Sequence, residues 1–222
     1  MLDPVTRLKA LDACALSDAL DFLGLTGATL RLRPLWACPM ICGRAITVQI
    51  GPKQGAQPTV HLNTTAIEQG GAGDVIVVAN GGREDVSCWG DILSSAARVK
   101  GIEGVVIDGA CRDIDANAEV GFPVYGRAVV PVSARGRIVQ VSMNEPVHVA
   151  GVTVAAGDLV LADGSGTVFV PAARADEVLT LAERLTKRQQ RMVAAVRAGR
   201  SVVEVMHDRE FDAVLAMEPA GK

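Results

Sequence analysis

Two carboxylates and a guanidinium stand out because each comes at the end of a predicted element. Asp91 follows Gly90 directly before a predicted helix, and Arg112 and Asp113 follow a buried-type β run that starts at Val105. The start of a helix leaves amide groups unpaired and carries the positive end of the helix dipole, so it attracts anions. A strand-helix-strand unit would therefore place all three charged side chains at one of its ends.

Each of these residues has a definite chemical capacity. Asp113 offers an oxygen ligand for a divalent cation, and Mg²⁺ is often held by one or two carboxylates together with waters and substrate oxygens. Arg112 can bind a carboxylate or a keto oxygen in a forked geometry that a lysine cannot reproduce. The amides of Ile92 and Leu93 can bind the same carboxylate, and Asp91 remains for proton transfer.

Taken singly, the same residues also have structural explanations. An aspartate in the position of Asp91 is commonly a helix N-cap. Arg112 and Asp113 could form a surface ion pair or cap the next helix. The residue types alone leave both interpretations open, so the longer sequence around them has to decide.

Blocks of sequence around these residues resemble the RraA-like proteins, which include the class II 4-hydroxy-4-methyl-2-oxoglutarate (HMG) and 4-carboxy-4-hydroxy-2-oxoadipate (CHA) aldolases. Asp91, twenty intervening residues and then Arg112-Asp113 match the pattern of that family. The resemblance covers nearly the whole chain, through CGRAITVQI (42–50), AGDVIVVANGG (72–82), WGDILSSAA (89–97), GVVIDGACRD (104–113), FPVYGR (122–127), PVHVAGVTVAAGDLVLADGSGTVFVP (146–171) and the helical tail.

The resemblance implies an architecture that pattern alone would give only as mixed α/β. It implies an α/β fold built as a layered β/β/α sandwich of the swivelling phosphohistidine-domain type, assembled as a homotrimer or homohexamer with sites between subunits. We expect residues 1–171 to form this domain and residues 172–222 to form a helical tail that packs on the same or a neighbouring subunit.

The resemblance also implies an activity. It implies a carbon–carbon lyase that depends on a divalent metal and cleaves 4-hydroxy-2-oxo acids such as HMG or CHA to pyruvate and a second keto acid. Asp113 would hold the metal, Mg²⁺ or Mn²⁺ or another divalent ion, and a bound metal stabilises the negative charge that builds on the keto oxygen. Decarboxylation of oxaloacetate leaves the same enolate, so it is expected as a side activity.

Site residues follow from the resemblance one by one. Asp91, Arg112 and Asp18 would be catalytic, with Asp18 reaching the site of a neighbouring subunit. The small 2-keto acid substrate would be bound by Gly90, Asp91, Ile92, Leu93 and Arg112. The chain departs from the aldolases in the tail, where they supply a further acidic group and this chain has Gln189.

Two other functions and one other aldolase mechanism compete with this assignment. A non-catalytic RraA-type regulator would bind ribonuclease E or a helicase, but such members generally lack the complete pattern from Asp91 to Asp113. A Schiff-base aldolase is disfavoured because none of the five lysines lies in a β-strand pattern. A methyltransferase is disfavoured because no nucleotide-type glycine loop joins a strand to a helix.

The composition of the chain limits which binding partners and which cellular compartment we expect. A net charge of −3 and 3% aromatic residues give no reason to expect nucleic acid. The N-terminus has charges spaced through it and no uninterrupted apolar core, so we expect neither a signal peptide nor a membrane contact.

Five cysteines at irregular spacings predict reduced thiols in a cytoplasm. Cys111 as a nucleophile would need a positioned base, and Cys38 and Cys42 lack the partners of a zinc site.

The remaining pattern predicts helices alternating with strands, then a β-rich second half. Helical periodicity predicts one helix over 5–22, alternation predicts a strand over 42–50, and 59–69 is predicted to be a short helix containing His61, which we do not assign to the site. A glycine-rich loop is predicted at Gly81, and helical spacing continues through the tail from 172 to 198.

Overall fold

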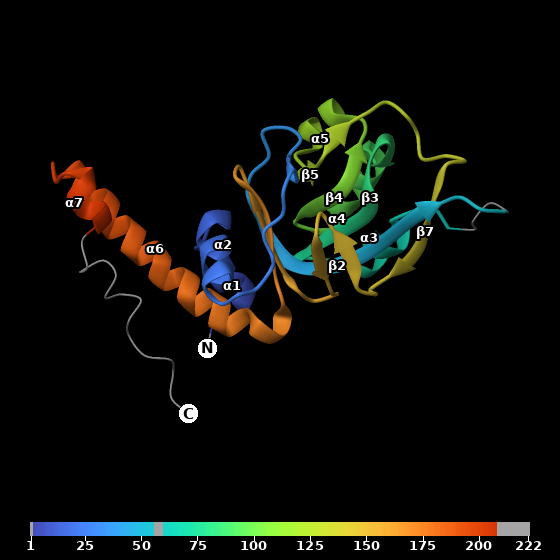
Figure 1. The fold of residues 1–222 in the computed structure, drawn as a ribbon. Coiled ribbons are helices and arrows are strands. Elements are labelled where there is room, and N and C mark those ends of the chain that lie inside the picture. The colour runs from blue at the N-terminus through green and yellow to red at the C-terminus, as the bar shows by residue number, and fades with distance from the viewer. Residues whose placement is uncertain (1, 56–59, 208–222) are drawn as a thin grey trace.

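The computed structural model describes residues 2–55 and 60–207 as a layered α/β fold with a projecting helical arm (Figure 1). A mixed sheet forms its centre. Along the sheet the order is β1 (Arg33–Pro34), β5 (Val124–Gly126), β4 (Gly104–Cys111), β3 (Asp74–Trp89), β2 (Ile41–Pro52), β10 (Leu159–Asp163) and β11 (Gly166–Val170), with β6 (Ala128–Val129) beside β4 and β7 (Ile138–Met143) beside β2.

The middle of this sheet is parallel and its margins are antiparallel. Strands β2, β3, β4 and β5 pair in parallel, and β6 pairs with β4 in the same sense. Strands β1, β7, β10 and β11 join antiparallel. All eight residues of β4 are buried, as expected for a parallel strand covered on both faces.

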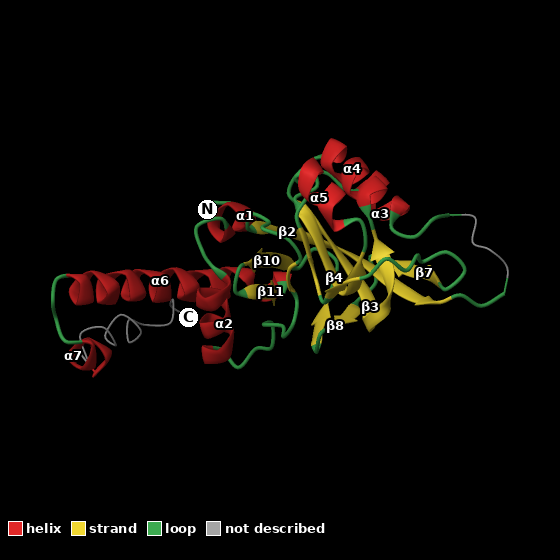
Figure 2. Cartoon of the chain, turned by 90° about the horizontal axis from the view of Figure 1, so that it is seen from above, coloured by secondary structure: helices red, strands yellow, loops and turns green. Residues whose placement is uncertain are grey.

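Different layers cover the two faces of the sheet. Helices α3 (Thr64–Gln69), α4 (Asp91–Lys100) and α5 (Ile114–Val120) lie on one face, and the hairpin of β8 (Val147–Val149) and β9 (Val152–Val154) lies on the other (Figure 2). The predicted α/β class and the predicted β/β/α layering are therefore confirmed.

The predicted glycine-rich loop at Gly81 is wrong, because β3 runs through it. Gly81 and Gly82 have φ of 63° and 72°, which glycine adopts without steric cost. The pairing of β3 with β4 shifts between Ala79 and Trp89, so this half of the strand is bulged. The bulges let β3 reach Trp89, which pairs with Cys111 at the end of β4.

The single helix predicted over 5–22 is also wrong. The structure has two helices here, α1 (Pro4–Leu8) and α2 (Ala13–Phe22). The carboxylate of Asp12 accepts a hydrogen bond from the amide of Ala15 at 2.8 Å and so caps a new helix. Capping chemistry starts α2 although the apolar spacing continues across the break.

The helix predicted over 59–69 is shorter than expected. Helix α3 begins only at Thr64, and residue 59 lies outside the described residues. Asn63 has φ of 64°, a left-handed conformation that cannot belong to the helix that follows it.

The C-terminal segment forms the arm. A short 3₁₀ turn, η1 (Ala172–Arg174), leads into α6 (Ala175–Arg197) and then α7 (Val202–His207). The first half of α6 packs against α1 and α2 and shares an apolar cluster with β10 and β11, while its second half extends away from the sheet (Figure 1). Residues 208–222 of the predicted tail lie outside the described residues. Within 2–55 and 60–207, no helix combines the length and the apolar character needed to cross a membrane.

Candidate active site

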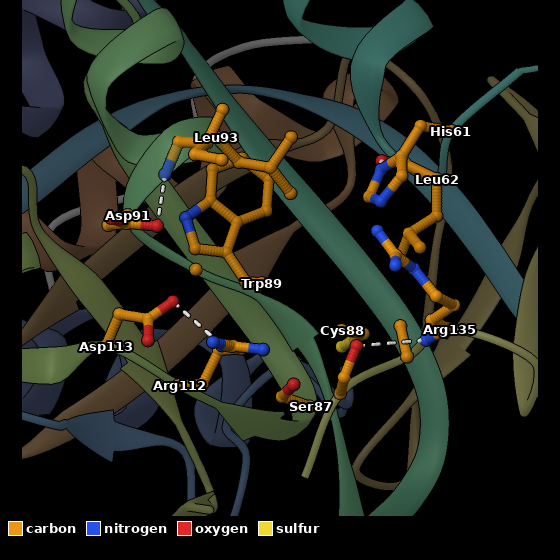
Figure 3. Close-up of a pocket in the computed structure, with 14 residues that line it drawn as sticks. His61, Leu62, Ser87, Cys88, Trp89, Asp91, Leu93, Arg112, Asp113 and Arg135 are labelled. Carbon is orange, nitrogen blue, oxygen red and sulfur yellow. Dashed lines mark hydrogen bonds and ion pairs between the residues drawn. The ribbon is translucent and has the colours of Figure 1, made fainter. Parts of the chain in front are cut away.

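Asp91, Arg112 and Asp113 lie together around one cavity of about 230 Å³ (Figure 3). Gly90 joins the end of β3 to α4, and Arg112-Asp113 joins the end of β4 to α5. Because β3 and β4 are parallel neighbours, their carboxyl ends open at the same edge of the sheet. Crevices at the carboxyl ends of parallel strands are common ligand sites in α/β folds.

Asp113 occupies a helix-capping position without acting as a cap. It precedes α5 with φ of 56° and ψ of 41°, and its side chain makes no capping hydrogen bond. Non-glycine residues in this left-handed region are uncommon, although aspartate tolerates it better than most. The carboxylate is 28% exposed and accepts a hydrogen bond from Arg112 Nε to Oδ2 at 2.8 Å. The capping explanation for Asp113 therefore fails, and its carboxylate remains available at the cavity.

The backbone of Arg112 is fixed from two sides while its side chain lines the cavity. Its amide donates to the carbonyl of Trp89 at 3.0 Å, and its carbonyl accepts from Asn117 Nδ2 at 2.9 Å. The side chain is 40% exposed. An ion pair this exposed contributes at most about 1 kcal/mol to stability, so the pair with Asp113 is a weak structural reason for the two residues to be there.

Asp91 is the first helical residue of α4, and the N-cap itself is Gly90. Asp91 Oδ1 accepts a hydrogen bond from the amide of Ile92 at 2.7 Å. The amide of Ile92 is thus engaged within the chain. The amide of Leu93 lies in the same first turn, where helix amides have no intrahelical acceptor.

The opposite wall of the cavity contains residues that sequence reasoning missed. His61 and Arg135 line it, and Ser87, Ser133 and Ala134 also line the cavity, the last two in the turn that leads to Arg135. The amide and the Oγ of Ser87 both donate to the carbonyl of Val132, at 2.9 Å and 2.7 Å, and so attach this turn to β3. No local motif marks the turn, because it reaches the cavity only through contacts between distant parts of the chain.

Buried polar contacts hold the floor of the cavity in place. Trp89 Nε1 donates to Ser94 Oγ at 2.8 Å, and the indole stacks on Phe122 with centroids 6.0 Å apart. Asn63, fully buried, donates from Nδ2 to the carbonyl of Cys88 at 2.8 Å. These contacts fix the last residues of β3, on which the position of Asp91 depends.

The thiols near the cavity are protonated at neutral pH. Burial raises the pKa of Cys111 to about 12, and burial likewise raises the pKa of Cys88 well above the usual range of a thiol. The thiolate is the reactive form of cysteine, so neither residue is suited to nucleophilic chemistry here.

Asp18 lies away from this cavity in the single chain. Its side chain is exposed and lines a separate groove between α2, α6 and α7. Gln189, the tail position where a family resemblance implies an acidic group, lines the same groove. Asp18, expected to reach a neighbouring subunit, and Gln189 therefore lie on one surface.

The oxygen ligands at the cavity suit magnesium better than zinc. Among residues 2–55 and 60–207, no group of three or more His, Cys, Asp or Glu side chains could enclose a metal ion. Structural and catalytic zinc sites need three or four such ligands, whereas Mg²⁺ keeps several waters and accepts one or two carboxylates. Asp113, with its partly exposed carboxylate, fits a Mg²⁺ site of this open type.

Comparisons with known proteins agree on one family. The family model described as Aldolase/RraA, of the RraA-like family, matches residues 13–169. A Halalkalibacterium halodurans protein named "Putative 4-hydroxy-4-methyl-2-oxoglutarate aldolase" is 32% identical over 82% of this chain and 83% of its own length. The Legionella pneumophila protein DlpA is 31% identical over 89% of this chain, but the match spans only 32% of DlpA.

Solved structures give the same result. An uncharacterised protein from Pseudomonas syringae pv. tomato has a TM-score of 0.83 and 34% identity, covering 91% of this chain and 96% of that one. A Streptomyces coelicolor protein described as an unusual member of the RNase ES inhibitor RraA protein family has a TM-score of 0.76 and 27% identity, covering 86% and 94%. The sequence relatives thus include a protein described as an aldolase, and the solved structures include one described as a member of an inhibitor family.

Proposed function

Because this chain belongs to the RraA-like family, we propose that it is a divalent-metal-dependent aldolase that cleaves 4-hydroxy-2-oxo acids such as HMG or CHA to pyruvate and a second keto acid. One observation carries the proposal. Arg112 and Asp113 line a cavity with Asp91, and the carboxylate of Asp113 makes no helix-capping bond that would explain its position.

The charged residues bind different groups on the pyruvyl half of the substrate. Arg112 binds the keto oxygen or the carboxylate through its guanidinium, and the amide of Leu93 binds the carboxylate at the start of α4. Asp113 would hold Mg²⁺ or Mn²⁺, which when bound acts as a Lewis acid that stabilises negative charge on the keto oxygen.

Asp91 moves the proton. Its carboxylate, directly or through a water, takes the proton from the C4 hydroxyl as the bond between C3 and C4 breaks and the hydroxyl carbon becomes a carbonyl. The bonding electrons pass to the keto oxygen of the pyruvyl half, giving the enolate of pyruvate. Return of the proton to C3 gives pyruvate. The same enolate forms when oxaloacetate loses CO₂, so we propose oxaloacetate decarboxylation as a side activity.

A Schiff-base mechanism has little support. The described residues that line the cavity include no lysine. Such a mechanism needs an amine that attacks the keto carbon from inside the site.

The proposal includes the oligomeric state of the protein and its location in the cell. We propose that the chain forms a homotrimer or homohexamer in which the groove carrying Asp18 and Gln189, with the projecting half of α6, lies against a neighbouring subunit. Asp18 would then reach the neighbour's cavity. The five cysteines are free thiols, which fits a reducing cytoplasm.

The competing function is a non-catalytic regulator that binds ribonuclease E or a helicase. The inhibitor description of the Streptomyces relative favours it. Retention of Asp91, Arg112 and Asp113 at one cavity favours the enzyme.

Removal of the metal tests the proposal. Purified protein incubated with HMG, CHA or oxaloacetate is expected to release pyruvate in the presence of Mg²⁺ or Mn²⁺, and excess EDTA should lower the rate at least ~10²-fold, because Lewis-acid stabilisation provides several kcal/mol. A lactate dehydrogenase assay reports the pyruvate. Added Mg²⁺ should restore the rate. Undiminished turnover in EDTA would contradict the mechanism.

Substitution of Gly90 tests whether turnover depends on the positions of the Arg112 and Asp113 side chains. The backbone of Gly90 is extended, with φ of −161°, so alanine can adopt it without strain. A Cβ there would lie 2.7 Å from Asp113 Oδ2 and 3.1 Å from Arg112 Cγ. Gly90→Ala should therefore displace both side chains and lower kcat/KM by about 10²-fold, as misplacements of 1 Å can, with little change in Tm.

A second glycine gives a matched control for that substitution. Gly71 lies outside the left-handed region, and a Cβ there would meet its nearest neighbour, the carbonyl oxygen of Lys100, at 4.0 Å. Gly71→Ala should leave both kcat/KM and Tm close to wild type. If Gly90→Ala behaves like Gly71→Ala, the close approach to Asp113 has no role in turnover.

A further inference from the structure

Arg135 presents a free guanidinium to the cavity from the wall opposite Arg112 and Asp113. Figure 3 shows its side chain extending beside His61, on the other side of the cavity from the Arg112–Asp113 pair. In the part of the chain that the structure describes, this guanidinium has no ion pair or hydrogen bond. It is therefore a cation without an anion, and Arg112, the one other arginine among the described residues that line the cavity, is already paired.

The turn that carries Arg135 is well braced. Arg137 Nη1 donates to the carbonyl of Ser133 at 3.0 Å and reaches that of Arg135 at 3.5 Å. The amide of Arg135 donates to Ser133 Oγ at 3.2 Å, and the amides of Arg137 and Ile138 donate to the carbonyl of Ala134. The backbone of Arg135 is thus held in place while its side chain is left unpaired.

The residues that line the cavity indicate which chemical group Arg135 can bind. The pair at one end suits a pyruvyl group, whose carboxylate and keto oxygen need a cation and amide donors. Trp89 and Leu93 give the same cavity an apolar part of its lining. A ligand that extends from that pair to Arg135 gains most if it places an anion there, because a guanidinium binds a carboxylate through two parallel hydrogen bonds.

We propose that Arg135 binds a second carboxylate, at the far end of the substrate, and so makes the enzyme selective for 4-hydroxy-2-oxo acids that carry one. This inference rests on the proposed aldolase function and adds its specificity-determining residue. Acids that end in a methyl group would leave Arg135 unpaired and would be poorer substrates.

The test compares two substrates that differ at that end. For wild type and Arg135→Ala, kcat/KM is measured with HMG, which has the second carboxylate, and with 4-hydroxy-2-oxopentanoate, which ends in a methyl group. Arg135→Ala should lower kcat/KM for HMG by ~10- to 100-fold, the range for a charge-assisted hydrogen-bonded pair, chiefly through KM. The value for 4-hydroxy-2-oxopentanoate should stay within about twofold of wild type.

Three further measurements separate recognition from structural damage. Exchange of the methyl protons of pyruvate in D₂O needs no distal carboxylate, so Arg135→Ala should retain it. Arg135→Lys keeps the charge and should recover part of the HMG activity. Arg98→Ala removes an exposed arginine from α4 outside the cavity and should leave both substrates unaffected.

The possible outcomes separate the two hypotheses. Equal losses on both substrates, or no loss on HMG, would overturn the role of Arg135 while leaving the aldolase intact. A wild-type protein that cleaves neither substrate and exchanges no pyruvate protons would overturn the proposed function, and the role of Arg135 with it.

Discussion

Replacing Asp113 by asparagine is expected to lower kcat for pyruvate release by ~10³-fold or more, because the loss of a bound metal removes several kcal/mol of transition-state stabilisation. Asparagine matches the size of aspartate but is neutral, so it cannot replace the anionic ligand. It also tolerates φ of 56°, whereas alanine in that conformation would add strain of its own. The measurements are the coupled lactate dehydrogenase assay at several Mg²⁺ concentrations and the Mg²⁺ affinity by calorimetry.

A neighbouring residue supplies the control for that experiment. Asp115 lies two positions further on, is exposed, and belongs to the first turn of α5 outside the cavity. Asp115→Asn removes the same charge from the same helix end and should leave turnover and Mg²⁺ affinity unchanged. If Asp113→Asn turned over at more than a tenth of the wild-type rate with the same Mg²⁺ requirement, Asp113 would not be the metal ligand.

The part of the site made by local sequence could be predicted. Asp91 opens a helix and Arg112 follows a buried strand, and both features are legible in short stretches of sequence. Their meeting then follows from one topological fact, that β3 and β4 are parallel neighbours whose carboxyl ends coincide. The layered fold came from the resemblance to a family, since pattern alone gave only a mixed α/β class.

The opposite wall could not be predicted because it depends on distant contacts. Arg135 reaches the cavity only because Ser87, 48 residues earlier, holds the start of the turn through Val132. His61 precedes a helix that starts later than its sequence suggests, since the left-handed Asn63 stands between them. Long-range hydrogen bonds of this kind leave no periodicity or spacing to detect.

At two other places the backbone differs from what the sequence pattern predicts, because one or two residues determine it locally. The apolar stripe through α1 and α2 gave no sign of the break at Asp12, where a single carboxylate supplies the cap of a second helix. Gly81 and Gly82 predict a loop, yet their positive φ values belong to a bulged part of β3. In both cases the backbone outcome depended on one or two residues rather than on the average of the segment.

Arg112→Ala is the substitution that separates binding of the metal from stabilisation of charge. We expect kcat to fall by ~10²- to 10³-fold, the effect of deleting one donor to a developing oxyanion. Arg112→Lys should recover little of this, because an ammonium group lacks the planar fork of the guanidinium. The rates are measured at saturating Mg²⁺, so that only the chemical step is compared.

The metal affinity of the same variant should move in the other direction. In wild type, Arg112 Nε donates to Asp113 Oδ2 at 2.8 Å, so a cation approaching Asp113 competes with the guanidinium for the carboxylate. Removing that competitor leaves Asp113 more negative toward the metal, and calorimetry should show Mg²⁺ binding that is unchanged or tighter although turnover has collapsed. Weaker Mg²⁺ binding together with a lowered Tm would instead mean that Arg112 acts by holding the turn between β4 and α5 in place. A slow enzyme that binds its metal well would assign Arg112 to the keto acid and leave the metal to Asp113, as proposed.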